Sequence, residues 1–388
     1  MSEQQALTNV ADRNTAALLP DGRAAGVEGV VLAGVHAWGH GILERVIARP
    51  LVPVANRPLI WHILTWLRDA GVGQSSVCAN SDTAALHRSL RDGGALHINL
   101  GYYEDIMPRG PAGCARDATQ GSDAELFVVV DGTILPRIDL PGLLDAHRNS
   151  GAALTLVAAN CGAAQEPLGI YVFSRTTMQQ IPASGYQDIK EGLIPRLYHQ
   201  GAPVRVFTVP PRSVPRVSNE ASYLAVNIRA VRDLVADSGT AGEYVASGSA
   251  RVHPSARIAD NARLLGPVVI GAGCVIEGDA LIIGPAVVGP SCHIGPGAII
   301  SRSVLWSGCV LEAEAFLDHS ILIDDARVAA GVTLRNCVHA PRGRVRAARL
   351  NGTTSNKHHA QQADTTVPEH DDAFLAAALG GARPQSTI

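Results

Sequence analysis

The chain has 388 residues, of which 46% are hydrophobic and 17% are charged, and its formal net charge at pH 7 is −3. This length allows two domains, each with its own core, and the composition is that of a globular protein. The near-neutral charge gives no electrostatic reason to expect nucleic acid or a membrane surface as a partner.

The N-terminal segment, residues 1–26, lacks the basic and then apolar pattern of a signal peptide, and we expect it to be a disordered tail. No stretch approaches 18 consecutive apolar residues, so no transmembrane helix is expected. The seven cysteines are odd in number and never spaced as C-x-x-C, which indicates neither a metal site nor a disulfide framework. A reducing cytoplasm is therefore the expected location.

Residues 27–240 are predicted to form an α/β domain with a mainly parallel sheet. The strand patterns are VEGVVLAG, SSVCA, ELFVVVD, AALTLVAA, GIYVFS and PVRVFTV. They alternate with helix patterns near residues 82–92, 139–149, 188–199 and 219–237. A further helix is expected in NRPLIWHILTWLRDAG, with Asn56 as its N-cap, Pro58 in its first turn and Gly71 just after its end.

Residues 250–341 follow a different pattern, in which hydrophobic residues recur every six positions. The first column is Val252, Ile258, Leu264, Ile270, Ile276, Ile282, Val288, Ile294 and Ile300, and the second is Ala256, Ala262, Val268, Cys274, Ala280, Ala286, Cys292 and Ala298. Further along, SVLW, SILI and CVHA repeat at an offset of 17. Three six-residue sides make one coil, so this period predicts a left-handed parallel β-helix of about five coils. Exposed coil edges favour oligomerisation.

Residues 342–388 are polar and lack periodicity, and we expect most of this tail to be disordered. Within it, AFLAAALGG is compatible with one short helix.

The segment RPLVPVANRPLIWHIL resembles the K-P-L-x-P-V-x-N-K-P segment of the sugar-1-phosphate nucleotidyltransferases, the NDP-sugar pyrophosphorylases. The order of other motifs is similar too: GPAGCARDA stands for G-T-A-G, VVVDGTIL for V-x-x-G-D and GIYVFS for G-I-Y. A Rossmann-like, GT-A-like domain before a hexapeptide β-helix resembles in particular mannose-1-phosphate guanylyltransferases and glucose-1-phosphate adenylyltransferases. The resemblance covers about residues 27–340 and implies synthesis of an NDP-sugar from an NTP and a sugar 1-phosphate.

The resemblance implies which residues contact the substrates. The nucleotide-binding positions are Ala33, Gly34, Arg49, Gly110, Ala112 and Gly113, and the sugar-binding positions are Gly169 and Tyr171. Arg49 stands where the family has the lysine of K-P-L, so it either binds an anion or is a solvated arginine.

The first phosphate loop departs from the family pattern. The family reads A-G-x-G-T-R, and this chain reads AGVHAWGHG, with His36, Ala37 and Trp38 in the glycine, threonine and arginine places. A side chain at His36 would crowd a phosphate group. The loop is therefore either a turn remnant or a rebuilt phosphate loop.

The resemblance also implies Mg²⁺ held by two aspartates, and Thr133 and Arg216 stand in their places. Magnesium prefers hard oxygen ligands, and an arginine would repel it. Asp131 lies two residues before Thr133, on the same face of an extended strand, and is a candidate substitute ligand or else a turn-capping residue. The E-K-P segment of the family is shortened here to NCGAAQEP, which has no lysine. We expect no cofactor unless a rebuilt site still uses Mg²⁺.

Three functions remain open. The first is a catalytically degenerate member that binds a nucleotide sugar or sugar phosphate, as a regulatory or scaffold subunit in a homo-oligomer or with an active paralogue. The second is an active nucleotidyltransferase whose candidate catalytic residues are Asp131 and Arg49, with His36 or His40. The third is a hexapeptide acyltransferase with His293 or His319 as its base. Four catalytic places are changed while both predicted cores are preserved, which favours the first function.

Overall fold

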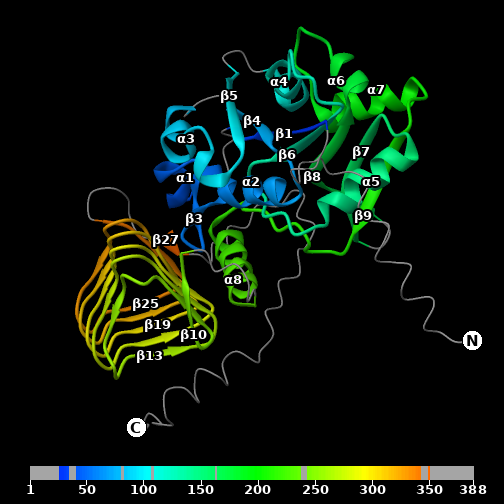
Figure 1. Ribbon diagram of the computed structural model, residues 1–388. Coiled ribbons are helices and arrows are strands. Elements are labelled where there is room, and N and C mark those ends of the chain that lie inside the picture. Colours follow the sequence, from blue (N-terminus) through cyan, green and yellow to red (C-terminus); the bar gives the residue numbers. More distant parts are fainter. Residues whose placement is uncertain are drawn as a thin grey trace, which may run out of the picture. The chain divides into compact units, whose positions relative to one another are not determined.

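The computed structural model describes residues 26–34, 41–79, 83–105, 109–161, 164–236, 243–341 and 348–349 (Figure 1). Apart from Gly26, Ala348 and Arg349, the two predicted tails lie outside these residues, and so do His36, Ala37, Trp38 and His40. The chain divides into two compact units, Met1–Ala230 and Val231–Ile388.

The first unit is built on a seven-stranded sheet with the order β5-β4-β1-β6-β8-β7-β9. The strands are β1 (Val27–Leu32), β4 (Gln74–Ala79), β5 (Asn99–Glu104), β6 (Leu126–Asp131), β7 (Leu154–Cys161), β8 (Ala164–Ser174) and β9 (Val204–Val209). Only β8 runs antiparallel to its neighbours β6 and β7, and the other pairs are parallel. The mainly parallel α/β sheet predicted from the alternating pattern is confirmed.

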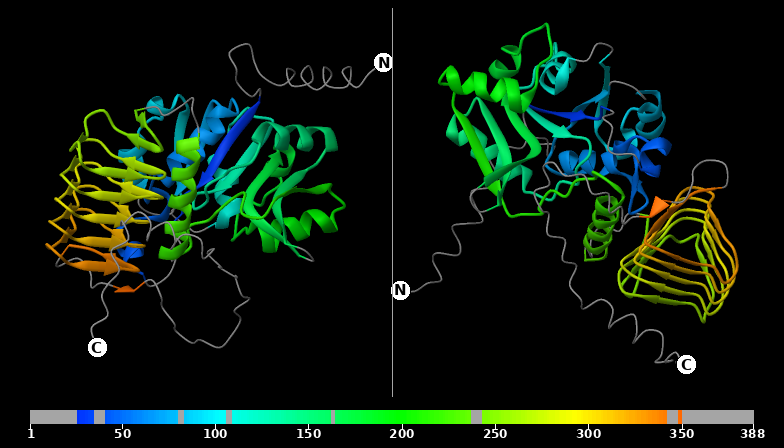
Figure 2. Two further views of the ribbon diagram at one scale, coloured as in Figure 1. Left: turned by 90° about the horizontal axis from the view of Figure 1, so that it is seen from below. Right: turned by 180° about the vertical axis from the view of Figure 1, so that it is seen from behind.

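Helices cover both faces of this sheet (Figures 1 and 2). The helices of the first unit are α1 (Ile42–Val46), α2 (Leu59–Asp69), α3 (Thr83–Leu90), α4 (Gly110–Ala118), α5 (Leu140–Ser150), α6 (Arg175–Gln179), α7 (Ile194–His199) and α8 (Glu220–Ala236), with shorter turns η2 (Arg49–Leu51), η3 (Gly94–Leu96) and the π-helical η4 (Ile189–Leu193). Helix α8 continues into the second unit.

The strands supply one core to each face because successive side chains alternate. In β6, Val128 and Val130 pack with α2, α3 and α5. Phe127 and Val129 of the same strand pack with α4, α6 and α7. This burial on both faces explains why the central strands are continuous apolar runs in the sequence.

The predicted N-cap of the second helix is wrong. Helix α2 begins at Leu59, its N-cap is Pro58, and no side chain caps it. Asn56 instead lies with Ala55 in the turn between β2 (Pro53–Val54) and β3 (Arg57–Pro58), and these two residues have φ values of 67° and 45°. Asparagine tolerates this left-handed conformation, so its turn preference outweighed its capping preference.

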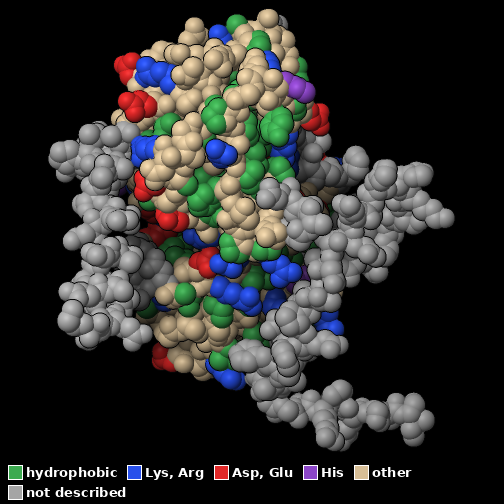
Figure 3. Space-filling view, turned by 90° about the vertical axis from the view of Figure 1, so that its right-hand side faces the viewer, with side chains coloured by type: hydrophobic (Ala, Val, Ile, Leu, Met, Phe, Trp, Pro, Cys, Tyr) green, Lys and Arg blue, Asp and Glu red, His purple; other side chains and the backbone are tan. Residues whose placement is uncertain are grey.

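Strand β9 ends the sheet order and is an edge strand. Figure 3 shows the right-hand side of the view in Figure 1, on which β9, α5 and α7 lie. Hydrophobic side chains gather in the middle of this side, with basic side chains between them. On β9 itself, Val206 is 42% exposed and Arg205 is also exposed. A charged side chain on an edge strand discourages pairing with another chain.

After the end of α8, the described part of the second unit is built of short strands in three sheets that stack as coils (Figure 1). The first sheet holds β10 (Val245–Ser247), β11 (Ala250–Val252), β14 (Val268–Ile270), β17 (Ala286–Val288), β20 (Val304–Leu305), β23 (Ile321–Leu322), β26 (Cys337–His339) and β27 (Ala348–Arg349). The second holds β12 (Arg257–Ile258), β15 (Val275–Ile276), β18 (His293–Ile294), β21 (Val310–Leu311) and β24 (Arg327–Val328), and the third holds β13 (Arg263–Leu265), β16 (Leu281–Ile283), β19 (Ile299–Ser301), β22 (Phe316–Asp318) and β25 (Thr333–Arg335). All neighbours from β11 to β26 pair in parallel.

The strand register follows the sequence repeat. Val268 pairs with Ala286, an offset of 18, and Val304 pairs with Ile321, an offset of 17. Both six-residue columns predicted from the sequence pack in one continuous core. The predicted parallel β-helix is confirmed by these sheets.

No helix that the structure describes is long and apolar enough to cross a membrane. Cys78, Cys114, Cys274, Cys292, Cys309 and Cys337 are all free and buried.

Candidate functional site

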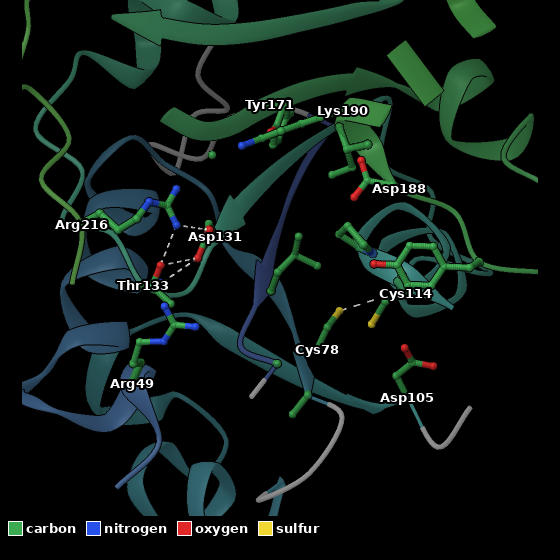
Figure 4. Close-up of a pocket in the computed structure, with 18 residues that line it drawn as sticks. Arg49, Cys78, Asp105, Cys114, Asp131, Thr133, Tyr171, Asp188, Lys190 and Arg216 are labelled. Atoms are coloured by element: carbon green, nitrogen blue, oxygen red, sulfur yellow. Dashed lines mark hydrogen bonds and ion pairs between the residues drawn. The ribbon is translucent and has the colours of Figure 1, made fainter. Parts of the chain in front are cut away.

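A pocket of about 320 Å³ lies in the first unit, where parallel strands end (Figure 4). Leu32, Ala79 and Asp131 line it, and they are the last residues of β1, β4 and β6. Eight residues singled out from the sequence also meet there: Gly34, Arg49, Gly110, Asp131, Thr133, Gly169, Tyr171 and Arg216. The carboxyl ends of parallel strands are the usual place for a ligand in α/β sheets.

Three residues predicted to bind nucleotide do not line the pocket. Ala33 is 1% exposed and packs in the core beneath one face of the sheet, and Ala112 is fully buried in the core of the other face. Gly113 faces the side chains of Arg109 and Gln187, and a Cβ there would lie 2.9 Å from the Arg109 Cβ. Each is adjacent in sequence to a lining residue, Gly34, Pro111 or Cys114, but does not itself line the pocket.

The pocket also contains residues that the sequence reasoning missed. They are Cys78, Asp105, Cys114, Tyr186, Asp188 and Lys190. Cys78 is near the end of β4 and Asp105 directly follows β5, so the rule about strand ends points to both. Tyr186, Asp188 and Lys190 come from a loop and the turn η4, where no sequence pattern indicates a site.

The centre of the site is a hydrogen-bonded group of Asp131, Thr133 and Arg216 (Figure 4). The backbone N–H and the hydroxyl of Thr133 both donate to Asp131 Oδ1, at 2.9 and 2.7 Å. Arg216 Nη1 donates to Asp131 Oδ2, forming an ion pair, and to Thr133 Oγ1 at 2.8 Å. Arg216 Nη2 also donates to the carbonyl oxygen of Leu168 at 3.3 Å. Both oxygens of the carboxylate are therefore engaged by the protein.

Backbone pairing brings these distant residues together. Leu135 N donates to Pro215 O at 2.8 Å, and Val217 N donates to Thr133 O at 2.9 Å. Ile134 and Arg216 are consequently partners in an antiparallel bridge. The chain segment before α8 is thus held against the turn that follows β6, which places the Arg216 side chain beside Asp131.

Charge and burial act together on the ionisable groups of the pocket. Burial alone would raise the pKa of Asp131, but the charge of Arg216 and the hydrogen bonds from Arg216 and Thr133 outweigh it and hold that pKa below its ordinary value. Burial lowers the pKa of Arg49, which Asp131 raises and Arg216 lowers. Burial raises the pKa of Tyr171. Arg49, Asp131 and Arg216 therefore interact as one charged group.

The side chains do not fit the magnesium ion that the fold family implies. Magnesium takes hard oxygen ligands, and a guanidinium group stands where a second carboxylate would be needed. Asp131, the carboxylate nearest this position, is already paired with that guanidinium. Across the part of the chain that the structure describes, no group of three or more His, Cys, Asp or Glu side chains is placed to hold a metal ion.

The two histidines that are candidates for acyl transfer lie on the β-helix, where His293 is exposed and His319 is partly buried. His293 Nε2 lies 2.5 Å from Glu277 Oε1, and His319 Nδ1 lies 2.8 Å from Asn336 Oδ1. Each contact joins neighbouring coils, so each histidine has a structural partner on the surface of the helix.

Comparison with known proteins matches both units. The nucleotidyl transferase family matches residues 42–192, and the GMPPB C-terminal domain family matches residues 246–347. A mannose-1-phosphate guanylyltransferase of Mycobacterium tuberculosis is 24% identical over 320 residues, covering 75% of this chain and 83% of the relative.

Other relatives carry different nucleotides and sugars in their names. A UTP–glucose-1-phosphate uridylyltransferase of Synechocystis is 24% identical and covers 74% of this chain and 91% of its own length. A glucose-1-phosphate thymidylyltransferase of Streptomyces antibioticus is 23% identical and covers 81% of this chain and 95% of its own length. With a nucleotidyltransferase sheet domain and a GMPPB-type C-terminal domain in one chain, this protein belongs to the sugar-1-phosphate nucleotidyltransferase family.

Proposed function

We propose that this protein is a non-catalytic member of its family that binds a nucleotide sugar or sugar phosphate and acts as a regulatory or scaffold subunit. The observation that carries the proposal is the ion pair between Arg216 and Asp131, with Thr133 beside it. Nucleotidyl transfer needs positive groups beside the attacked phosphate to stabilise its negative charge, and in this family a metal ion is one of them. The Arg216 guanidinium group would repel that ion, and it already pairs with the Asp131 carboxylate that could bind it.

The pocket itself supports a retained binding role. Its volume of about 320 Å³ lies within the range of roughly 300–1,000 Å³ that is usual for small-molecule sites. Arg49, Gly110, Gly169 and Tyr171 all line it. The relatives act on different bases and sugars, so we propose the class of ligand, an NDP-sugar or sugar 1-phosphate, and no particular base or sugar.

The test is release of pyrophosphate by the purified full-length protein with Mg²⁺. Five nucleoside triphosphates, ATP, GTP, CTP, UTP and dTTP, should be paired with mannose, glucose and N-acetylglucosamine 1-phosphates, and an active mannose-1-phosphate guanylyltransferase serves as positive control. We expect no release above the rate without enzyme. Turnover with any pair would reject the non-catalytic proposal in favour of an active enzyme with a rebuilt site.

A pair of double variants tests the reason for inactivity. Thr133→Asp with Arg216→Asp places carboxylates at both family metal positions, and we expect this variant to bind Mg²⁺ in calorimetric titration where the wild-type protein does not. The matched control is Thr133→Asn with Arg216→Gln, which removes the same side chains without adding charge. Equal Mg²⁺ binding by the wild-type protein and the aspartate variant would show that Arg216 does not exclude the metal.

The regulatory role requires an effect on an active enzyme. We propose that the protein assembles with itself or with an active paralogue in the cytoplasm. Adding it to an active family member from the same organism should change that enzyme's rate in a way that depends on NDP-sugar concentration. An unchanged rate at every concentration would leave no support for the regulatory part of the proposal.

A further inference from the structure

The pocket contains three basic side chains that reach it from separate parts of the chain. Arg49 belongs to η2, Lys190 to η4, and Arg216 to the segment before α8. Lys190 is one of only two lysines in the whole sequence, the other being Lys357. In Figure 4, the Lys190 side chain extends across Tyr171 toward the side of the pocket that holds Arg216.

The charges of the pocket are unevenly distributed. In Figure 4, Arg49 and Arg216 lie on either side of Asp131 and Thr133, while Asp105 and Asp188 lie across the pocket near Cys78 and Cys114. The single carboxylate between the two guanidinium groups offsets one of their two positive charges. Glu44 also acts on Arg49 and raises its pKa. With Lys190, three basic side chains line this side of the pocket, which suits an anionic ligand.

The carboxylates on the other side are engaged in backbone contacts. Asp105 is 8% exposed, and its Oδ2 accepts from the backbone N–H of Arg109 at 3.0 Å. Asp188 caps η4, because its Oδ1 accepts from the backbone N–H of Glu191 at 2.6 Å. One oxygen of each acidic group is thus engaged by the backbone.

Arg216 is held ready to bind an anion. Asp131, Thr133 and the carbonyl oxygen of Leu168 fix its guanidinium group, while the side chain is still 33% exposed and lines the pocket. A guanidinium group is planar, permanently charged and well matched to phosphate oxygens. Because its orientation is set before the ligand arrives, little conformational entropy is lost on binding.

Resting on the proposed function, we infer that this pocket binds the diphosphate group of a nucleoside diphosphate sugar directly, through Arg49, Lys190 and Arg216, and without a divalent cation. Arg216 performs the neutralisation of phosphate for which related enzymes need a metal ion. The pocket also offers a surface for a ring, because Tyr186 lines it with an aromatic side chain that is 65% exposed. An exposed aromatic ring at a pocket rim is suited to stacking.

The experiment is calorimetric titration of the full-length protein in excess EDTA and, separately, with Mg²⁺. The probes are inorganic pyrophosphate, inorganic phosphate, GDP-mannose and UDP-glucose. We expect pyrophosphate and at least one of the two NDP-sugars to bind in EDTA, with no gain in affinity from Mg²⁺, and inorganic phosphate to bind at least about tenfold more weakly because it spans fewer of the basic groups.

Variants identify the groups that bind. Arg49→Gln and Lys190→Gln should each weaken pyrophosphate binding about tenfold or more. Arg216→Gln is combined with Asp131→Asn, so that Asp131 is not left without its partner. This double variant should also weaken pyrophosphate binding about tenfold or more. Arg205→Gln, on the exposed edge strand β9, is the control and should bind as the wild-type protein does. Denaturant unfolding confirms that each variant is folded.

The outcomes separate this inference from the proposed function. Binding of pyrophosphate or NDP-sugar only when Mg²⁺ is present would overturn the metal-free site, while the absence of turnover would still stand. Unchanged binding in all three pocket variants, or no binding of any probe in EDTA, would also overturn it, and equal affinity for phosphate and pyrophosphate would overturn the assignment to a diphosphate. Turnover in the pyrophosphate-release assay would reject the non-catalytic proposal. The titration in EDTA would then still decide whether the diphosphate group binds without a metal ion.

Discussion

A Cβ atom on residue 169 would lie 2.7 Å from Nη2 of Arg216 and 2.9 Å from the Cβ of Asp131, so only glycine leaves room for the arginine at this position. Gly169 also has a φ of 83°, a left-handed conformation that favours glycine. Gly169, the glycine of the G-I-Y motif, thus accommodates the Arg216 side chain in this protein.

Replacing Gly169 with alanine should displace Arg216. Gly121 has a φ of 84° and nothing within 4 Å of its would-be Cβ, so Gly121→Ala is a matched control that carries only the backbone strain. We expect Gly121→Ala to lower the free energy of unfolding by about 1 kcal/mol. Gly169→Ala should cost at least about 1 kcal/mol more because Arg216 has to move. Urea denaturation measures both, and equal losses would show that the close contact relaxes without cost.

Replacing Asp131 with asparagine should destabilise the protein by about 1 kcal/mol at neutral pH, since both members of the pair are partly solvated. The side chains of Asp131 and Arg216 are each 33% exposed. Asp145→Asn is the control, because its contact with Arg148 is 3.8 Å long and more exposed.

The difference in the free energy of unfolding between the wild-type protein and Asp131→Asn should also depend on pH. The pKa of Asp131 is lower in the folded protein than its ordinary value, so the pair stabilises the fold above about pH 4 and loses this contribution as the pH falls through the folded pKa. The difference in the free energy of unfolding between the two proteins should be constant from pH 7 to 5 and become smaller in more acidic solution. A difference that becomes larger as the pH falls would contradict the assigned ion pair.

His147 should make stability depend on pH in a different window. It is 2% exposed, its Nδ1 lies 2.8 Å from the hydroxyl of Thr155, and burial lowers its pKa to about 4. The unfolded chain binds this proton near pH 6.5 and the folded chain does not, so stability is lost as the pH falls from 6.5 toward 4.

The His147→Gln variant removes this titration. We expect the wild-type protein to lose about 1 to 2 kcal/mol more than His147→Gln between pH 7 and pH 5. Chemical denaturation at the two pH values measures the difference. Identical pH dependence in both proteins would mean that His147 is protonated as readily in the folded state as in the unfolded state.

In the β-helix, truncation should cost stability only where the side chain points inward. Leu311 is fully buried in the core and its neighbour Val310 is partly exposed, although both belong to β21. Leu311→Ala should lower the free energy of unfolding by about 2 to 5 kcal/mol. Val310→Ala should lower it by less than about 1 kcal/mol. Thermal unfolding followed by circular dichroism tests this, and similar losses would show that the alternation does not set the core.

Most of the fold follows from periodicity. Val128 and Val130 face one core and Phe127 and Val129 the other, because β6 is buried on both sides, and a continuous apolar run is the sequence mark of such a strand. The β-helix repeat is stronger still, since a six-residue period leaves one arrangement that buries every column. Strand β5, NLGYYE, had no such mark, because its residues are only partly buried or exposed at the edge of the sheet.

The amino-acid sequence alone predicted that Thr133 and Arg216 stand at the two metal positions that the family resemblance implies. The tertiary structure decided which groups these two side chains contact. Arg216 pairs with Asp131, which lies 85 positions away, only because backbone pairing joins the segment before α8 to the turn after β6. Lys190 enters the same pocket from η4. Such contacts depend on where loops meet in space, and no local pattern of hydrophobic and polar residues encodes them.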